Sequence, residues 1–388
     1  MQIETKLPKV GTTVFTEMSQ LATEYGALNL GQGFPDFEGP QRLRDALTRA
    51  MNDGRNQYAP MAGVPALRAQ IAAKVQALYG RTVDADSEVT VTSGATEAIF
   101  AAIAAVVRSG DEVIVFDPCY DSYEPAIELN NGIAVHVPLT SYKEAGDQFA
   151  VDWQRVKQAI TAKTRMIIVN SPHNPSGAVL SADDLEALAE LTRATGIYIL
   201  SDEVYEHIVF DSQPHRSLSR HTELAQRSFI VSSFGKTYHC TGWKIGYCVA
   251  PRLLSEEFRK VHQYLTFSSF APAQFALAEV LEHETQHHLQ LSDFYQARRD
   301  RFRNLLATAK LRLLPVAGAY FQLADFSAIA PDKTDLQFCD WLVREVGVAA
   351  IPLSVFYRDP PAGQRLIRFC FAKSDQILEQ AAQKLCRI

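Results

Sequence analysis

The stretch Met166-Ile-Ile-Val-Asn-Ser-Pro-His-Asn-Pro175 starts with an apolar run of strand length and continues directly into a polar turn. The same order recurs in Ile197-Tyr-Ile-Leu-Ser-Asp-Glu-Val-Tyr205 and in Phe229-Ile-Val-Ser-Ser-Phe-Gly-Lys236. Continuous apolar runs of this length are typical of strands that are buried on both faces. Such strands belong to sheets covered by helices, so this stretch predicts an α/β fold.

Helices are predicted between these strands. Residues 182–194 have Ser181 as N-cap, Asp184 to complete a capping box, and Gly196 past the end. The strand–helix–strand order predicts a mostly parallel sheet with helices on both faces. Residues 245–250 follow the last strand too closely for a crossover helix, which favours an antiparallel addition. The upstream elements are strands at 88–92 and 112–116, with helices at 40–51, 65–79 (closed by Gly80) and 95–108.

The pattern changes towards the C-terminus. After a long helical stretch at about 273–309, the sequence predicts strands at 312–325 and 366–371 and helices at 336–345 and 376–386. This mixture is typical of a smaller α+β domain. The length of 388 residues also indicates one large domain plus a smaller one. We expect a large domain over 41–285, a small C-terminal domain over 286–388, and an N-terminal segment over 1–40 that joins the small domain.

The composition disfavours several classes of protein. Hydrophobic residues make up 47% and charged residues 21%, as in a globular chain with a large core. The net charge of −6, without a run of lysine and arginine, disfavours a nucleic-acid partner. No stretch reaches about 18 consecutive apolar residues, so we expect no membrane span. Six scattered cysteines and an N-terminus without an apolar core indicate a cytoplasmic protein without a structural metal.

Polar residues follow each predicted strand, and in open α/β sheets ligands bind beyond the carboxyl ends of the strands. Each residue also has a structural explanation when it is taken alone. Gly94 suits a turn, Asp202 suits a helix cap, and Lys236 suits an exposed surface position. The functional alternative is that the N–H groups of Ala95 and Thr96 hold a phosphate at a helix start. A lysine enclosed between apolar runs would have a lowered pKa and could form a Schiff base.

Together these turns offer a phosphate site, a carboxylate, hydrogen-bond donors, a flat aromatic ring and a reactive amine. Pyridoxal 5′-phosphate has a phosphate, a pyridine nitrogen, a phenolic oxygen, a flat ring and an aldehyde. The residues match these groups one for one, so the sequence predicts this cofactor.

The chain resembles the aminotransferases of the type I pyridoxal-phosphate fold over essentially its whole length, from Gly31-Gln-Gly-Phe-Pro-Asp-Phe37 to Ile367-Arg-Phe-Cys-Phe371. Within that group it is similar to bacterial methionine aminotransferases and, more loosely, to kynurenine aminotransferases. The resemblance implies a mostly parallel seven-stranded sheet with a smaller α+β domain. The segments that carry it are 170–175, 201–205, 233–238 and 242–246.

The resemblance implies a catalytic set of Lys236, Asp202 and Tyr205. Lys236 matches the Schiff-base lysine, which also moves the proton between Cα and the cofactor's C4′ carbon. Asp202 matches the carboxylate that keeps the pyridine nitrogen protonated. Asn174 and Tyr205 match the donors to the phenolate oxygen, and Tyr120 matches the ring that stacks on the cofactor.

Further residues are implied around the phosphate and the substrate. Tyr58 matches a tyrosine that reaches the phosphate of the neighbouring subunit, which implies a homodimer. Arg368 matches the arginine that binds the substrate's α-carboxylate, with Gly33 and Asn174 beside it. The predicted phosphate-binding residues are Ala95, Thr96, Ser233 and Lys244.

The function that the resemblance implies is transfer of an amino group from an amino acid donor to a 2-oxo acid. Two alternatives on the same scaffold are a β-lyase acting on cysteine conjugates and an aminotransferase of the kynurenine and glutamine type. A third is a cofactor-sensing regulator, but the chain has no spare basic helix-turn-helix. Some kynurenine-type relatives carry an aromatic residue where this chain has Ala95, which affects the expected shape of the pocket.

The predicted donor is methionine, or an aromatic or other large neutral amino acid. Enzymes for acidic substrates need a second arginine, which by resemblance comes from the stretch about thirty residues past the lysine. Here that stretch is Tyr264-Leu-Thr-Phe-Ser-Ser-Phe-Ala-Pro272, which has three aromatic residues and no arginine. We therefore expect aspartate to be a poor donor.

Overall fold

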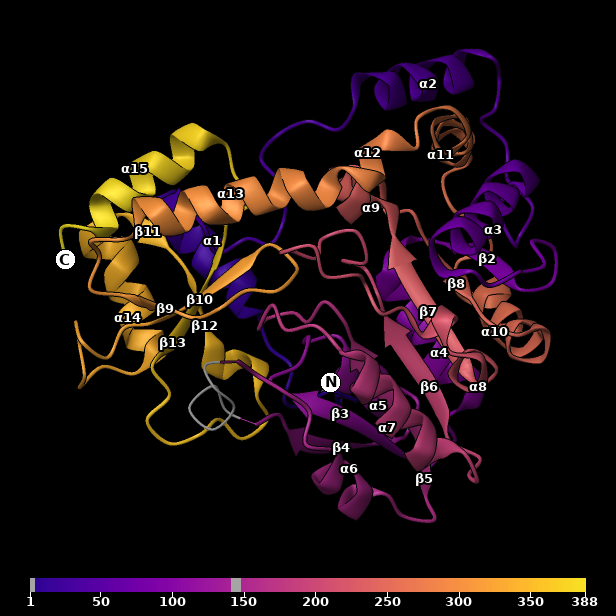
Figure 1. The fold of residues 1–388 in the computed structure, drawn as a ribbon, viewed down its shortest axis with the longest axis horizontal. Helices are drawn as coiled ribbons and strands as arrows, with labels where there is room; N and C mark the ends of the chain where they lie inside the picture. The colour runs from indigo at the N-terminus through magenta and orange to yellow at the C-terminus, as the bar shows by residue number, and fades with distance from the viewer. Residues whose placement is uncertain (1–3, 141–147) are drawn as a thin grey trace.

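A computed structural model describes residues 4–140 and 148–388 of the chain. Its central feature is a seven-stranded sheet in the order β2-β8-β7-β6-β5-β3-β4 (Figure 1). Strand β8 is antiparallel to both of its neighbours, and the other neighbouring strands are parallel. The predicted mostly parallel sheet and the antiparallel addition are both confirmed. The strands are β2 Val89–Thr92, β3 Glu112–Asp117, β4 Ile133–Pro138, β5 Thr164–Asn170, β6 Tyr198–Asp202, β7 Ser228–Ser233 and β8 Gly246–Val249.

Strand β4 has no counterpart among the segments located from the sequence. It pairs with β3 at the edge of the sheet, and most of its residues are partly exposed. Its sequence, Ile133-Ala-Val-His-Val-Pro138, includes a polar His136 and ends in proline. An edge strand tolerates both features because one side of its backbone has no partner strand. The apolar run that identifies central strands is therefore missing here.

Both faces of the sheet are buried, as predicted. On β3, Ile114 and Phe116 belong to one hydrophobic cluster, whereas Val113 and Val115 belong to another on the opposite face. This alternation follows from the two-residue period of a strand. The helices of this region are α2 Gln41–Asn52, α3 Pro65–Tyr79, α4 Gly94–Val106, α5 Tyr123–Leu129, α6 Trp153–Ala159, α7 Ala182–Thr192, α8 Thr222–Ala225, α9 Phe234–Thr237 and α10 Arg252–Leu265, with 3-10 turns Leu218–Arg220 and Thr241–Trp243.

The predicted helical stretch at 273–309 consists of three helices, α11 Ala271–His283, α12 Gln286–Leu289 and α13 Leu291–Leu305. The strand expected over 312–325 is also divided, because residues 315–320 leave the sheet and several of them pair with loops of the large domain region. There Ala317 and Gly318 donate their N–H groups to the carbonyl of Gly177. The divided strand contributes β9 Arg312–Leu313 and β10 Phe321–Asp325 to a four-stranded sheet with β12 Ile351–Pro352 and β13 Leu366–Cys370.

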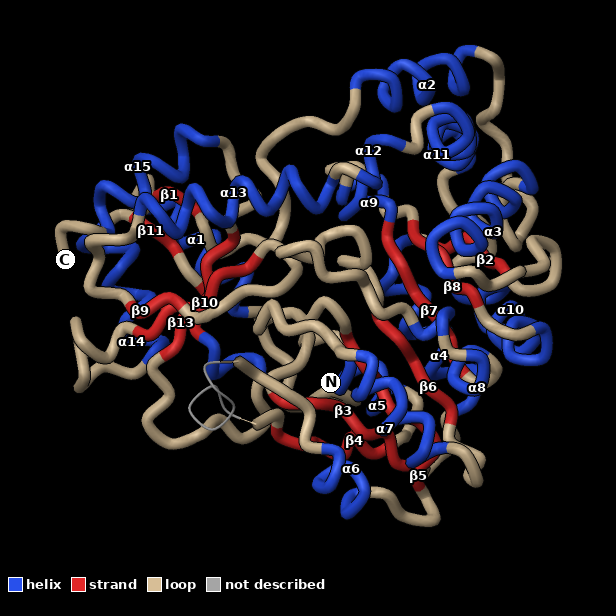
Figure 2. The backbone as a smooth tube through the Cα atoms, viewed as in Figure 1, coloured by secondary structure: helices blue, strands red, loops and turns tan. Residues whose placement is uncertain are grey.

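The N-terminal segment joins this smaller sheet region. Strand β1 (Leu28–Asn29) pairs in parallel with β11 (Val348–Ala349), and α1 (Val14–Glu24) lies beside β11 (Figure 1). Figure 2 shows the two groups of strands, one around β10 and β13 and the other running from β2 to β4. Within the described residues, no helix combines the length and apolar character that crossing a membrane requires. The remaining helical elements are α14 Asp335–Trp341, a π-helical turn Leu342–Val346, a 3-10 turn Leu353–Phe356 and α15 Asp375–Leu385.

Candidate active site

A cavity of about 410 Å³ opens at the carboxyl ends of the central parallel strands. Its position follows from the fold, because the turns after parallel strands meet at one edge of the sheet. Eleven of the twelve predicted site residues line this cavity, and Tyr58 does not. The eleven are Gly33, Ala95, Thr96, Tyr120, Asn174, Asp202, Tyr205, Ser233, Lys236, Lys244 and Arg368.

Lys236 lies in the short helix α9, directly after β7. Its Nζ donates a hydrogen bond to the carbonyl of Gly33 at 3.3 Å. The same atom lies 5.9 Å from the ring centres of Tyr205 and Tyr320. Burial among these groups lowers the pKa of Lys236 to about 8. About a tenth of this amine is therefore uncharged at pH 7, far more than for an ordinary lysine, and a nucleophile or a proton acceptor must be uncharged.

Asp202 ends strand β6, and its carboxylate is held from both sides. The hydroxyl of Tyr123 donates to Oδ2 at 2.6 Å, and the N–H of Val204 donates to Oδ1 at 3.3 Å. Burial raises the pKa of Asp202 to about 6, against the effect of these hydrogen bonds. Tyr123 was not predicted as a site residue from the sequence, although it lies three residues after Tyr120. Its contact with Asp202 depends on where α5 packs.

Arg368 is almost fully buried, in the middle of β13. Its Nη1 donates to Oδ1 of Asn174 at 2.7 Å, and its Nη2 donates to the carbonyl of Gly31 at 3.1 Å. Its guanidinium lies 4.1 Å from the ring centre of Phe321, while its buried Nε has no hydrogen-bond partner among the described residues. Because Asn174 accepts through Oδ1, its amide nitrogen is left as a donor towards a ligand.

The start of α4 has the geometry of an anion-binding corner. The side chain of the N-cap residue, Ser93, accepts no hydrogen bond from the first N–H groups of the helix. These N–H groups are therefore not capped by Ser93. Gly94 has a φ of +73°, and a Cβ at this position would lie 3.3 Å from Nζ of Lys244. Glycine therefore lets the lysine approach the helix N-terminus, where phosphate groups bind. Ala95, Thr96 and Ser233 line the same corner.

These residues fit pyridoxal 5′-phosphate. The anion-binding corner suits its phosphate, Asp202 suits its pyridine nitrogen, and the free amide hydrogens of Asn174 suit its phenolic oxygen. Tyr120 provides a flat ring in the cavity wall, and its hydroxyl stays protonated because burial raises its pKa to about 12. The buried Nε of Arg368 leaves a hydrogen-bond donor that suits a carboxylate group.

The predicted substrate-contacting stretch 264–272 lies outside the cavity of its own chain. Tyr264 is 90% exposed and Phe270 is 47% exposed, so these rings do not face the core either. Tyr58 is 82% exposed and lies near Phe267, with ring centres 5.2 Å apart. Three other aromatic rings line the cavity and were not singled out from the sequence: Phe15, Phe34 and Phe321.

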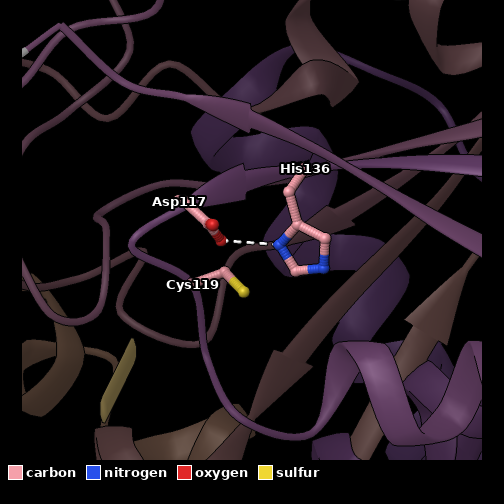
Figure 3. Close-up of side chains that lie close together, drawn as sticks. All are labelled: Asp117, Cys119 and His136. Atoms are coloured by element: carbon pink, nitrogen blue, oxygen red, sulfur yellow. Dashed lines mark hydrogen bonds and ion pairs between the residues drawn. The ribbon is translucent and has the colours of Figure 1, made fainter. Parts of the chain in front are cut away.

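A second cluster lies outside the cavity and contains Asp117, Cys119 and His136, whose donor atoms lie within 4.8 Å of one another (Figure 3). No metal was expected from the sequence. Asp117 accepts hydrogen bonds from Nδ1 of His136 at 2.7 Å and from the N–H of Arg358 at 3.2 Å. Burial raises the pKa of the Cys119 thiol. The cluster therefore forms hydrogen bonds that support the turn leading to Tyr120.

Comparison with known proteins places this site in a family. Residues 25–385 match the family model for aminotransferases of class I and II. The chain is 53% identical over 382 residues to the methionine aminotransferase of Escherichia coli, covering 98% of this chain and 97% of that protein. It is 42% identical to a probable N-succinyldiaminopimelate aminotransferase of Mycobacterium tuberculosis, over 98% of this chain and 97% of that one.

Solved structures of aminotransferases are also similar to this chain. The Escherichia coli protein YbdL, described as having a methionine aminotransferase function, superimposes with a TM-score of 0.96 at 52% identity, covering 100% of both chains. The aspartate aminotransferase of Thermus thermophilus with maleate gives a TM-score of 0.89 at 31% identity, also over 100% of both chains. The chain belongs to the class I and II aminotransferases, a family of enzymes that depend on pyridoxal 5′-phosphate.

Proposed function

We propose that this enzyme transfers the amino group of methionine, or of an aromatic or other large neutral amino acid, to a 2-oxo acid. The observation that carries the proposal is the composition of the cavity wall. Among the described residues, the cations of this wall are Lys236, Lys244 and Arg368, and each of the three has another role in the proposed reaction. Phe15, Phe34 and Phe321 line the same cavity and supply apolar surface.

Each cation has a role in the proposed reaction. The bound cofactor withdraws electrons from the substrate's Cα, which makes the Cα proton acidic. The amine of Lys236 accepts that proton and carries it, which its lowered pKa allows. Lys244 neutralises the phosphate. Arg368 binds the α-carboxylate of the substrate and so orients the Cα–H bond.

The remaining site residues would orient the ring of the cofactor and stabilise its charges. The carboxylate of Asp202 stabilises a protonated ring nitrogen, and Tyr123 orients that carboxylate. Tyr205 and Asn174 would hold the phenolic oxygen of the bound cofactor through hydrogen bonds that they donate. Tyr120 would offer its flat ring to the cofactor and help to exclude water. These assignments rest on the geometry of the cavity and on the resemblance of the motifs.

A distal carboxylate would lose its water shell without gaining a partner from this wall, at a cost of roughly 3 kcal/mol or more. A thioether or an aromatic ring would instead gain about 1–3 kcal/mol from burial and from sulfur–aromatic contact. The 53% identity to a methionine aminotransferase supports the same preference.

The test is a donor panel with a fixed 2-oxo acid acceptor. We expect kcat/KM for methionine to exceed that for aspartate by about a hundredfold or more. Higher kcat/KM values for aspartate or glutamate than for methionine would overturn the proposal. A parallel assay with a cysteine conjugate and no 2-oxo acid acceptor distinguishes the β-lyase alternative from an aminotransferase. Only a lyase would release pyruvate and ammonia under these conditions.

We also propose that the active unit is a homodimer in the cytoplasm. The exposed aromatic rings of Tyr58, Tyr264 and Phe270 support a partner surface on that side of the chain. Tyr58 would then reach the phosphate in the partner's site. The six cysteines are all free thiols, as is usual in a reducing compartment.

A further inference from the structure

His262 is a fully buried histidine to which the proposed reaction gives no role. It lies in α10, which packs against α4, and its side chain is 0% exposed. Its Nδ1 lies 2.8 Å from Oε1 of Glu97, and its Nε2 lies 2.8 Å from the carbonyl oxygen of Met61. A carbonyl oxygen only accepts hydrogen bonds, so Nε2 carries a proton. The bond between Nδ1 and Glu97 needs a second proton, which an imidazolium paired with a carboxylate supplies.

The surroundings of His262 favour the charged imidazolium. Burial alone would lower its pKa, but the hydrogen bond and charge of Glu97 and the bond to Met61 outweigh burial, so the pKa lies above the ordinary value of 6.5. Arg259, also on α10, acts in the opposite direction. Cys248 on β8 faces Glu97, and burial raises the pKa of its thiol, which therefore stays neutral. If His262 loses its proton, the buried carboxylate of Glu97 has no counter-charge.

Glu97 connects His262 to the anion-binding corner at the start of α4. It lies in the first turn of that helix, and its Oε2 accepts a hydrogen bond from the N–H of Ser93 at 2.9 Å. This bond spans the turn that contains Ala95 and Thr96, which line the cavity. An uncompensated negative charge in this turn would oppose the binding of a phosphate, and the imidazolium of His262 neutralises it.

The bond to Met61 connects His262 to the segment 56–62, which carries Tyr58. The same residue also holds Phe267, whose N–H donates to the carbonyl of His262 at 2.9 Å. The ring of Phe267 lies 5.2 Å from that of Tyr58. His262 therefore has bonds on one side to the start of α4 and on the other side to the surroundings of Tyr58.

We propose that His262 is a positioning residue for the cofactor's phosphate and that, as an imidazolium, it holds the start of α4 and the segment 56–62 together. This role rests on the proposed function, because it needs the phosphate at the anion-binding corner and Tyr58 in the partner's site. His262 serves the site of its own chain through Glu97 and the partner's site through Tyr58. It contacts neither cofactor nor substrate, so its replacement weakens cofactor binding and leaves the chemical step to other residues.

Three substitutions separate the charge from the hydrogen bonds. In Glu97→Gln the amide oxygen can accept the N–H of Ser93, and the amide nitrogen can donate to Nδ1 of a neutral His262, so the bonds persist without the charges. His262→Phe keeps a flat ring and removes the bonds to Glu97 and Met61. His283→Gln replaces a histidine whose side chain is 51% exposed, and it serves as the matched control.

Equilibrium dialysis of the holoenzyme gives the Kd for pyridoxal 5′-phosphate in each protein. We expect His262→Phe to raise this Kd by about tenfold, the effect of one hydrogen bond to a charged group, and His283→Gln to leave it unchanged. With saturating cofactor, kcat of His262→Phe should stay within about threefold of wild type. A role in stability alone would lower the melting temperature of His262→Phe without changing the Kd of the folded protein.

The pH dependence of the Kd tests the charge directly. The wild-type protein should bind the cofactor as tightly as Glu97→Gln near pH 6.5 and about tenfold more weakly at alkaline pH, as a shift of one unit in the pKa of His262 on binding gives. The sign follows from the raised pKa, because the imidazolium is present at low pH and is lost as the pH rises. Comparison with Glu97→Gln removes the titration of the phosphate and of Lys236, which both proteins share.

A ratio of the two Kd values that does not change with pH, or an unchanged Kd in His262→Phe, would overturn the role of His262. If His262→Phe folds poorly, the comparison of wild type with Glu97→Gln still decides it. If the wild-type holoenzyme converts no amino acid donor, the proposed function fails, and the dialysis still reports on His262.

Discussion

At the scale of single residues, Lys236 and Asp202 show how one physical cause prepares two groups for opposite tasks. Burial disfavours the charged form of each, so it lowers the pKa of the amine to about 8 and raises that of the carboxyl to about 6. The two values move towards neutral pH from opposite sides. Such convergence within one cavity is typical of a site that moves protons.

The lowered pKa of Lys236 predicts how the apoenzyme captures pyridoxal 5′-phosphate at different pH values. Only the uncharged amine can attack the aldehyde, so the rate should rise with pH and level off above a midpoint near 8. An ordinary lysine amine has its midpoint near 10.4. Borohydride trapping followed by peptide mass spectrometry measures the rate at Lys236, with N-acetyl-lysine methyl ester as the control. A midpoint at or above about 10 would contradict the prediction.

The role of Asp202 can be separated from its structural hydrogen bonds. Asp202→Asn keeps the shape of the side chain and removes its charge, so we expect the cofactor to stay bound while kcat falls by about a hundredfold or more. Tyr123→Phe is the matched variant, because it removes the 2.6 Å hydrogen bond and leaves the charge. We expect it to lower kcat by less than about tenfold. An unchanged kcat in Asp202→Asn would mean that Asp202 acts only as a structural hydrogen-bond acceptor for Tyr123 and Val204.

At the scale of elements, two helix ends that look alike in sequence behave differently. Helix α3 ends at Gly80 with a left-handed φ of +74°, as predicted. Helix α7 has the predicted Ser181–Asp184 capping box, but its end does not use Gly196 in this way. Gly196 does not have a left-handed φ, and Arg193 ends the helix in an ordinary helical conformation. The expected glycine cap of α7 is wrong because a positive φ depends on where the chain turns next.

This difference predicts unequal effects of alanine. Gly80→Ala should lower the free energy of unfolding by about 1 kcal/mol, because an L-residue in the left-handed region is strained. Gly196→Ala should change it by less than about 0.5 kcal/mol, since no atom lies within 4 Å of the added Cβ. Urea unfolding followed by circular dichroism measures both. Equal losses in the two variants would show that φ does not decide the cost.

At the scale of the whole molecule, the proposed homodimer gives the exposed Tyr58 a role. Tyr58 is 82% exposed in the single chain and outside its cavity, which suits a residue that acts in a neighbouring subunit. The domain boundaries at residues 40 and 285 stay predictions. The sheets are compatible with them, since the seven-stranded sheet lies within 89–249 and the four-stranded sheet within 312–370.

Tyr58→Phe tests the proposed homodimer. The variant loses one hydroxyl, so we expect sedimentation to show the same dimer while the affinity for pyridoxal 5′-phosphate falls by about tenfold, the effect of one hydrogen bond to a charged group. Tyr264→Phe removes the hydroxyl of a similarly exposed tyrosine and should leave the cofactor affinity unchanged. A fully active monomer at the assay concentration would contradict the assembly.

The sequence by itself determined the parallel sheet and eleven residues of the cavity. Asp202 ends strand β6, Asn174 and Lys236 lie in the turns that follow β5 and β7, and the parallel arrangement brings these strand ends to one edge. Local order along the chain was therefore enough to bring them together. The capping box of α7 and the glycine end of α3 were also visible, because they involve neighbours in sequence.

Only the tertiary structure decided what surrounds these residues. Phe15, Phe321 and Phe356 enclose the guanidinium of Arg368 at 5.3, 4.1 and 5.0 Å, and they come from three distant segments. The support of Asp202 by Tyr123 likewise depends on how α5 packs against the sheet. Contacts between segments far apart in the chain depend on three-dimensional packing, to which no local pattern of residues points.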